Sequence, residues 1–147
     1  MALSLTPEPP VPVYALHPIG HVRSSLTDPA HAPKQGADGA PDAWLEFRPE
    51  VAPGLAELRV GDEVLVLTWL DRADRATLRV HPRDDPAAPL RGVFSTRSAD
   101  RPNPIGLHRV RVAEIADASR IRVGPLEAVD GTPVLDVKPV LGPRDER

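Results

Sequence analysis

The apolar residues of this chain form short runs that keep no helical period, and proline or glycine separates one run from the next. We find no internal repeat. Short strands that recur in this way are typical of a β-sandwich or a β-barrel. The strands that we expect are 13–22, 44–47, 63–70, 77–81, 107–115, 121–123 and 134–137, with two turns of helix over 51–58. The pattern therefore predicts a mainly β fold with little helix.

The length of 147 residues is that of one domain with one core. Residues 1–12 are rich in proline and predict a flexible lead-in, 13–140 predict the folded domain, and 141–147 predict a polar tail. The apolar run within 63–70 is nearly continuous and indicates a strand buried on both faces. The residues 117–120 between two expected strands form a credible hairpin connection, which favours antiparallel pairing.

Composition excludes several classes of protein. No cysteine is present, which excludes a disulfide framework, an iron–sulfur cluster and a thiolate nucleophile. The histidines lack the spacing of a zinc site, so we expect no metal. The longest apolar run is too short to span a bilayer, so we expect no membrane partner and a cytoplasmic protein. A net charge of −3 and 3% aromatic residues argue against a uniformly basic, base-stacking nucleic-acid surface.

The stretch 92–106 is the most distinctive part of the chain. Its first five residues predict a short buried strand. In the loop that follows, Pro102 and Pro104 stiffen the backbone around Asn103, and Arg97 and Arg101 offer two permanently charged forks. Two arginines on a stiff loop suit a carboxylate or phosphate ligand. The alternative is that each arginine is solvated or holds backbone carbonyl groups.

A second distinctive stretch, 130–139, begins with Asp130 and Gly131. An Asp-Gly turn exposes backbone N–H groups and one carboxylate, which suits the hydroxyls of a ribose or an amino group. A plain tight turn is the alternative. Asp136 and Lys138 lie two apart on a strand, where they can form a charge pair on one face.

The stretch 92–106 resembles the motif of the TsaA/TrmO-like family through its Thr-Arg-Ser, Arg-Pro-Asn and Pro-Ile-Gly elements. Residues 19–24 are similar to the opening of the same family, and 130–139 are similar to its second motif. Members are tRNA threonylcarbamoyladenosine N6-methyltransferases that use S-adenosylmethionine. The resemblance implies a single antiparallel β-barrel and a homodimer with the cofactor site near the subunit boundary.

The resemblance also implies a set of site residues. The cofactor contacts carried over are Pro33, Lys34, Gln35, Asp71, Arg72, Arg97, Leu107, Asp130, Gly131, Thr132 and Pro133. Arg97 could pair with the methionyl carboxylate, and Leu107 could line the adenine or simply pack in the core. We assign Arg101, Asn103 and His108 to the substrate. The catalytic proton acceptor stays open between Asp71, Asp130 and a water molecule.

Three positions depart from the family pattern. Lys34 replaces an arginine, Asp71 stands where members have histidine, and Val140 stands where many have tyrosine after Lys-Pro. The prediction is an S-adenosylmethionine-dependent methyltransferase that acts on N6 of threonylcarbamoyladenosine beside the tRNA anticodon. The alternative is an S-adenosylmethionine-binding module or sensor, or a methyltransferase for a small non-tRNA substrate. Either interpretation requires the Arg97 loop and the Asp130 turn to enclose a common pocket, within one chain or together with a neighbouring copy.

Overall fold

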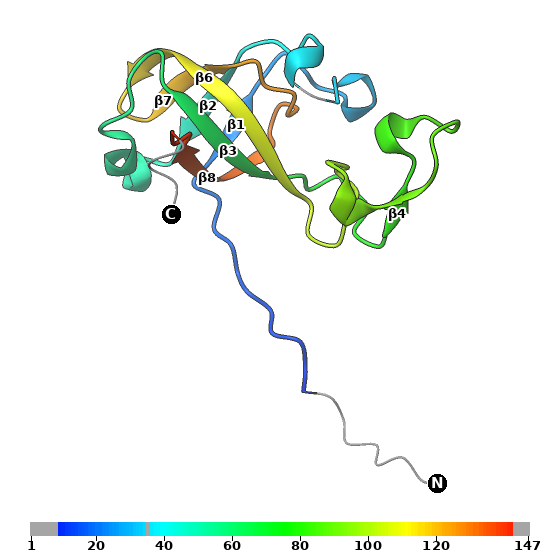
Figure 1. The fold of residues 1–147 in the computed structure, drawn as a ribbon. Helices are drawn as coiled ribbons and strands as arrows, with labels where there is room; N and C mark the ends of the chain where they lie inside the picture. Colours follow the sequence, from blue (N-terminus) through cyan, green and yellow to red (C-terminus); the bar gives the residue numbers. More distant parts are fainter. Residues whose placement is uncertain (1–8, 35, 143–147) are drawn as a thin grey trace, which may run out of the picture.

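The computed structural model describes residues 9–34 and 36–142, and its main body is a closed antiparallel barrel (Figure 1). The barrel strands are β1 (Gly20–Arg23), β2 (Ala43–Phe47), β3 (Glu63–Trp69), β6 (Ile105–Asp117), β7 (Arg120–Gly124) and β8 (Pro133–Pro139). They pair in the order β1-β2-β7-β6-β3-β8, and β8 closes the barrel by pairing with β1. The prediction of a mainly β, antiparallel barrel is confirmed.

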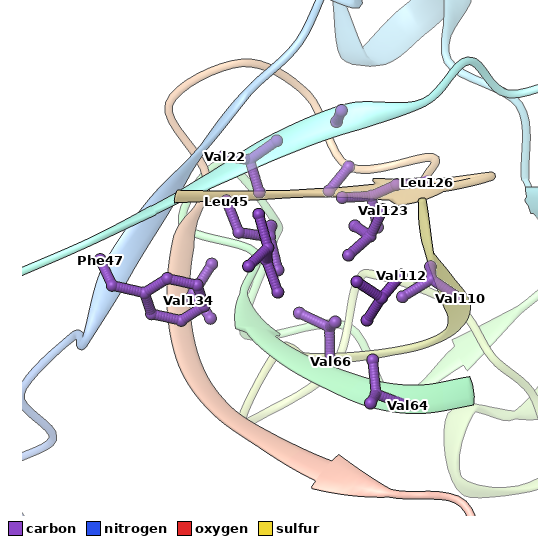
Figure 2. Close-up of a cluster of buried hydrophobic side chains, with 13 residues drawn as sticks. Val22, Leu45, Phe47, Val64, Val66, Val110, Val112, Val123, Leu126 and Val134 are labelled. Carbon is purple, nitrogen blue, oxygen red and sulfur yellow. The ribbon is translucent and has the colours of Figure 1, made fainter. Parts of the chain in front are cut away.

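The alternation of side chains along these strands builds the core. On β3, Val64, Val66 and Thr68 are fully buried, while their neighbours face outward. The inward residues are mostly β-branched, which suits a pleated surface packed on one side. Figure 2 shows them converging inside the barrel, and the cluster comprises Val22, Ala43, Leu45, Phe47, Val64, Val66, Val110, Val112, Ile121, Val123, Leu126, Ala128 and Val134.

Residues 70–104 form a lobe that projects from one end of the barrel beside the label β4 (Figure 1). The lobe contains the short pair β4 (Arg79–Val80) and β5 (Arg91–Gly92) and the 3-10 helices η4 (Pro82–Asp84) and η5 (Val93–Ser95). Elsewhere the chain forms η1 (Pro29–His31), η2 (Gly36–Asp38) and η3 (Pro49–Leu55). No helix in the described part of the chain has the length and apolar character needed to cross a membrane.

Three expected elements differ from the structure. The helix over 51–58 is the 3-10 helix η3, which contains Pro53, a residue that cannot donate a backbone hydrogen bond. The expected strand over 92–96 is instead the 3-10 turn η5, closed by the Thr96 N–H donating to Val93 O. The first strand begins only at Gly20, because β8 pairs with β1 from that residue onward.

The expectation that 63–70 is buried on both faces is also wrong. Leu65, Leu67 and Trp69 on the outer face of β3 are only half-buried. The reason is the topology, since a barrel strand has the core on one side only. Because the outer residues of this strand are apolar as well, its sequence has the nearly continuous apolar pattern that is typical of a strand in the middle of a parallel sheet.

The register of the strands places three loops at one end of the barrel. Thr68 near the end of β3 pairs with Gly106 near the start of β6 and with Val134 near the start of β8. Consequently the segments 24–42, 70–104 and 125–132 all leave from this end. β7 ends at Gly124, opposite Arg111, so residues 105–110 of β6 pair with β3 alone. This unpaired edge of β6 lies beside the loops.

Candidate functional site

A groove of about 630 Å³ follows the unpaired edge of β6. Its lining combines β6 with the start of β3, the lobe, η2 and the segment after β7. The lining residues are Gly36, Ala37, Glu63, Arg97, Leu107, His108, Arg109, Val110, Arg111, Gly124, Pro125 and Glu127. Of the residues assigned from the sequence, the groove therefore brings together Arg97, Leu107 and His108.

The edge of β6 contributes backbone groups to the groove. The Leu70 N–H donates to Pro104 O and the Val112 N–H donates to Asp62 O, which shows that even-numbered residues of β6 bond to β3. The N–H and C=O groups of Leu107 and Arg109 consequently point the other way, where β7 has already ended. A planar ligand that lies there meets a donor and an acceptor of the main chain next to the Leu107 side chain.

Three arginines line the groove, and Arg97 differs from the other two because it forms no ion pair with another described residue. Its side chain is exposed, and no partner for it is found among residues 9–34 and 36–142. Arg109 and Arg111 instead share the carboxylate of Glu63, through contacts of 2.5 Å and 2.9 Å. The hydrogen bond from Arg109, helped by the positive charge of both arginines, lowers the pKa of Glu63. Arg97 is therefore the group best placed to receive an anion.

Three polar side chains form a chain of hydrogen bonds at the inner wall of the groove, and two of them, Thr68 and His108, are buried. His108 Nε2 lies 2.7 Å from Thr68 Oγ1, and His108 Nδ1 lies 2.5 Å from Glu127 Oε1. Thr68 is fully buried, and the Glu127 side chain is 17% exposed. Buried polar groups are costly unless they are paired, so this chain holds all three side chains in fixed positions.

Two glycines make room for this arrangement. A Cβ at Gly106 would lie 2.2 Å from Thr68 Oγ1 and 2.6 Å from His108 Nε2, so a side chain there would break the Thr68–His108 hydrogen bond. A Cβ at Gly36 would lie 2.9 Å from Pro125 O and 3.2 Å from Glu127 Oε2. The glycine at 36 thus allows the loop after β1 to pack directly against the groove.

Two of the three residues assigned to the substrate build the loop instead. One terminal nitrogen of Arg101 donates to Val93 O and, at 2.6 Å, to Thr96 O. Asn103 Oδ1 accepts a hydrogen bond of 3.0 Å from Arg75. The backbone-clamp reading of Arg101 is the one that the structure bears out, and the clamp fixes the turn that presents Arg97.

The Asp130 turn joins the start of β8 to the end of β1. Asp130 Oδ1 accepts from the Ser24 N–H at 3.0 Å, and the Gly131 N–H donates to Val22 O at 2.7 Å. The hydroxyl of Thr132 donates to Val129 O, and Gly131 has a φ of 84°. Neither Asp130, Gly131, Thr132 nor Pro133 lines the groove, because the turn is directed toward β1 within one chain.

The remaining assigned residues surround the same end of the barrel without lining the groove. Asp71 and Arg72 are exposed in the turn after β3. Lys34 forms an ion pair with Asp84, which ties the loop after β1 to the lobe. Pro33 is half-buried next to it, and Gln35 lies outside the described residues. No group of three or more His, Asp or Glu side chains in the described part of the chain is placed to hold a metal ion.

The comparisons with known proteins agree with this architecture. Residues 21–146 match the model of the tRNA-methyltransferase O N-terminal domain family, TrmO_N. The chain belongs to this family. Among TrmO_N relatives, the probable S-adenosyl-L-methionine-binding protein of Methanothermobacter thermautotrophicus is 40% identical over 84% of this chain and 88% of its own length. The S-adenosyl-L-methionine-binding protein of Archaeoglobus fulgidus is 41% identical over 84% of this chain and 86% of its own length.

A crystal structure of TrmO from Pseudomonas aeruginosa has the same fold, with a TM-score of 0.71 and 29% identity over 94% of this chain. This TrmO_N chain spans only 61% of that protein. The barrel and the lobe are therefore shared with the solved TrmO structure.

Sequence reasoning missed Thr68 and Glu127. The available signal was a polar residue at an inward position, since Thr68 follows Val64 and Val66 at a spacing of two. His108 breaks the inward face of β6 in the same way. The pairing of Thr68 with Gly106, which brings the two polar residues together, depends on a register between strands that are far apart in the sequence.

Proposed function

We propose that this chain binds S-adenosylmethionine in the groove and is a methyltransferase. The volume of the groove falls in the range of about 300–1,000 Å³ that is usual for small-molecule sites. When bound, the cofactor supplies an electrophilic methyl group attached to a positively charged sulfur. The Glu127 carboxylate on the inner wall and the Arg97 guanidinium on the lobe provide groups of opposite sign for a ligand that carries both charges.

Each part of the cofactor has a matching group in the groove. Arg97 would hold the carboxylate of the methionyl moiety, since a fork of N–H donors suits two carboxylate oxygens. Leu107 and Pro125 would cover the faces of the adenine, and the unpaired backbone groups of β6 would bond to its edge. The relatives named as S-adenosyl-L-methionine-binding proteins support this assignment.

The observation that carries the proposal is that Arg97 has no partner among the described residues. Three arginines line the groove, and two of them are committed to Glu63. Arg101, four residues away in the same loop, is committed to backbone carbonyl groups. The loop is therefore stiffened by one arginine and leaves the other available for a ligand.

We further propose that the methyl acceptor is N6 of threonylcarbamoyladenosine beside the anticodon of tRNA. The matching family model is that of the N-terminal domain of tRNA-methyltransferase O. Within residues 70–104, the lobe carries seven arginines and five aspartates. Arg72 and Arg91 are exposed there and have no partner among the described residues. Such arginines suit contacts with the phosphate groups of a nucleic acid. The homodimer and the cytoplasmic location stay predictions.

The second candidate function is that of an S-adenosylmethionine-binding module or sensor, or of a methyltransferase for a small substrate. The names of the relatives favour it, because the two archaeal proteins of which this chain covers 86–88% are named only for binding S-adenosyl-L-methionine.

Calorimetry with S-adenosylmethionine tests the pocket. We expect Arg97→Ala to weaken binding about 10- to 100-fold, the range for loss of a charge-assisted hydrogen-bond pair, with no change in thermal stability. Arg91→Ala is the matched control, because Arg91 is an exposed arginine of the same lobe that does not line the groove. Equal affinities of the two variants would remove Arg97 from the site.

Mass spectrometry of tRNA tests the acceptor. Incubation of tRNA that carries threonylcarbamoyladenosine with the protein and S-adenosylmethionine should add one methyl group to that nucleoside. Tight cofactor binding with no mass shift in the tRNA would favour the binding module.

A further inference from the structure

We infer that Glu127 accepts the proton released in methyl transfer, and that His108 and Thr68 position its carboxylate. This inference rests on the proposed methyltransferase function. It assigns a role to two residues, Glu127 and Thr68, that no family motif in the sequence pointed to. It also changes the role of His108 from a substrate contact to a positioning residue.

The carboxylate of Glu127 has one oxygen fixed and one oxygen available. Oε1 lies 2.5 Å from His108 Nδ1, while no hydrogen bond to Oε2 is found among residues 9–34 and 36–142. Oε2 lies beside Gly36, where a Cβ would come within 3.2 Å of it, so the glycine keeps this oxygen from being covered by a side chain. Because Glu127 lines the groove, Oε2 is the oxygen that a ligand can reach.

The hydrogen bonds also fix the proton on His108. Thr68 is fully buried, and His108 Nε2 is the partner found for its hydroxyl within the described residues. If Nε2 accepts the Thr68 proton, then Nδ1 carries the ring proton and donates it to Glu127. This neutral tautomer leaves none of the three groups unpaired. A doubly protonated ring would leave the Thr68 hydroxyl proton without an acceptor.

Methylation at N6 of a carbamoylated adenine requires such a group. The nitrogen lone pair is shared with the purine ring and the carbonyl group, so the nitrogen attacks well only as its proton leaves. In this step the bond from the methyl carbon to sulfur breaks as the bond to nitrogen forms. The bonding electrons remain on sulfur, which becomes a neutral thioether, and the proton on nitrogen passes to Oε2 of Glu127.

The other ionisable groups around the groove are less suited to this role. Glu63 is held by Arg109 and Arg111, and Arg97 carries a permanent positive charge. Asp71 and Asp130, the acceptors considered from the sequence, do not line the groove. Glu127 is thus the carboxylate of the groove that is partly buried and that has, among the described residues, no hydrogen bond to one of its oxygens.

The variant Glu127→Gln tests the inference directly. A glutamine keeps the size of the side chain and an oxygen that can accept from His108 Nδ1, but it cannot accept a proton. We expect the single-turnover rate of methyl transfer, measured with S-adenosylmethionine at saturating concentration, to fall about 10²- to 10⁴-fold. Glu114→Gln, an exposed carboxylate of β6 outside the groove, is the control.

The tautomer of His108 gives a readout that needs neither ligand nor turnover. In ¹⁵N NMR spectra of the ligand-free protein at neutral pH, we expect Nδ1 to be protonated and Nε2 to be a bare acceptor. Thr68→Val, which is similar in size but has no hydroxyl, should shift the Nε2 signal while the Nδ1 proton remains. A ring protonated at Nε2 alone would overturn the positioning of Glu127, because Nδ1 would then have no proton to donate to Oε1.

The outcomes separate this inference from the proposed function. If the wild-type protein binds S-adenosylmethionine but methylates neither tRNA nor small acceptors, the methyltransferase function is overturned, and the proton acceptor with it. If the wild-type protein is active and Glu127→Gln transfers the methyl group at a similar rate, only the role of Glu127 is overturned.

Discussion

The Arg97 loop and the Asp130 turn both match motifs of one family, yet the structure uses them differently. In the loop, the Arg101 guanidinium donates hydrogen bonds to two backbone carbonyl groups, and Arg97 lines the groove. In the turn, the carboxylate of Asp130, the N–H of Gly131 and the hydroxyl of Thr132 all have partners within the barrel. One segment presents a ligand group, and the other closes the barrel.

This difference shows why a motif match assigns a region more securely than it assigns a residue. A stretch that must hold one side chain in place uses most of its polar groups for its own structure. In the loop, Arg101 holds the backbone, and Arg97 is the arginine that can bind a ligand. The Asp130 turn lies at the same end of the barrel, since Pro133 and Val134 pair with β1 and Thr68 pairs with Val134. Its polar groups nevertheless connect β8 to β1.

The largest effect that we predict is a difference in the free energy of unfolding between alanine variants of Gly106, in the loop, and Gly131, in the turn. Gly106→Ala should lower the free energy of unfolding by about 3 kcal/mol, because its Cβ would overlap Thr68 and His108, which are both buried and cannot move away. Gly131→Ala should cost only about 1–2 kcal/mol, since the space around it is open and only its positive φ is strained. Urea unfolding of both variants measures the difference, and equal losses would contradict it.

The second prediction contrasts the two arginines of the loop. Arg101→Ala should lower the free energy of unfolding by about 2 kcal/mol, since buried carbonyl groups lose a charged donor. Arg97→Ala should change it by less than about 0.5 kcal/mol, as is usual for an exposed side chain. Thermal unfolding checks both values. Arg101→Lys should restore less than half of the loss, because an ammonium lacks the planar fork.

Sequence reasoning predicted a mainly β fold because the strands carry local signals, while the family resemblance supplied the choice of a barrel over a sandwich. The short apolar runs and the short connection from β6 to β7 appear in the sequence without knowledge of the partner strands. The same reasoning failed at 92–96, where Val93 is buried but Phe94 is 82% exposed. Two adjacent apolar residues fit a strand or a turn equally well, and the packing of Val93 against its surroundings decided between them.

The candidate site was predicted in part for the same reason. The stiff loop with Arg97 is a local feature and was recognised. The Thr68–His108–Glu127 chain joins three separate elements, and its existence depends on strand register. The commitment of Arg101 to Val93 and Thr96 was one of two readings of the sequence, and only the fold of the loop separated them.

The third prediction tests whether the Asp130 turn is structural. Asp130→Ala should cost about 1 kcal/mol, because the Ser24 N–H loses its acceptor. Asp130→Asn keeps an oxygen at that position and should cost less than half as much. Chemical denaturation measures the stability, and calorimetry of the same two variants measures cofactor affinity. A stable Asp130→Asn protein with weakened affinity would show that the turn also binds the cofactor.

The smallest effect concerns acid pH and the ion pair beside the turn. The Arg23 Nε–H donates to Glu46 Oε1 at 2.6 Å, and this hydrogen bond lowers the pKa of Glu46. A carboxylate with a lowered pKa in the folded state contributes stability above its unfolded pKa, and this contribution is lost as the pH falls through the folded pKa. We therefore expect the wild-type protein to lose more stability than Glu46→Gln between neutral and acid pH.

Carbon-13 NMR of the glutamate carboxyl groups sharpens the same comparison. Arg23→Ala should raise the titration midpoint of Glu46 and leave that of Glu63 in place, because the pKa of Glu63 is lowered by Arg109 at the groove. Arg109→Ala should do the reverse. If both midpoints moved in either variant, the turn and the groove would be coupled electrostatically, and the division of the two segments into a structural part and a binding part would no longer hold.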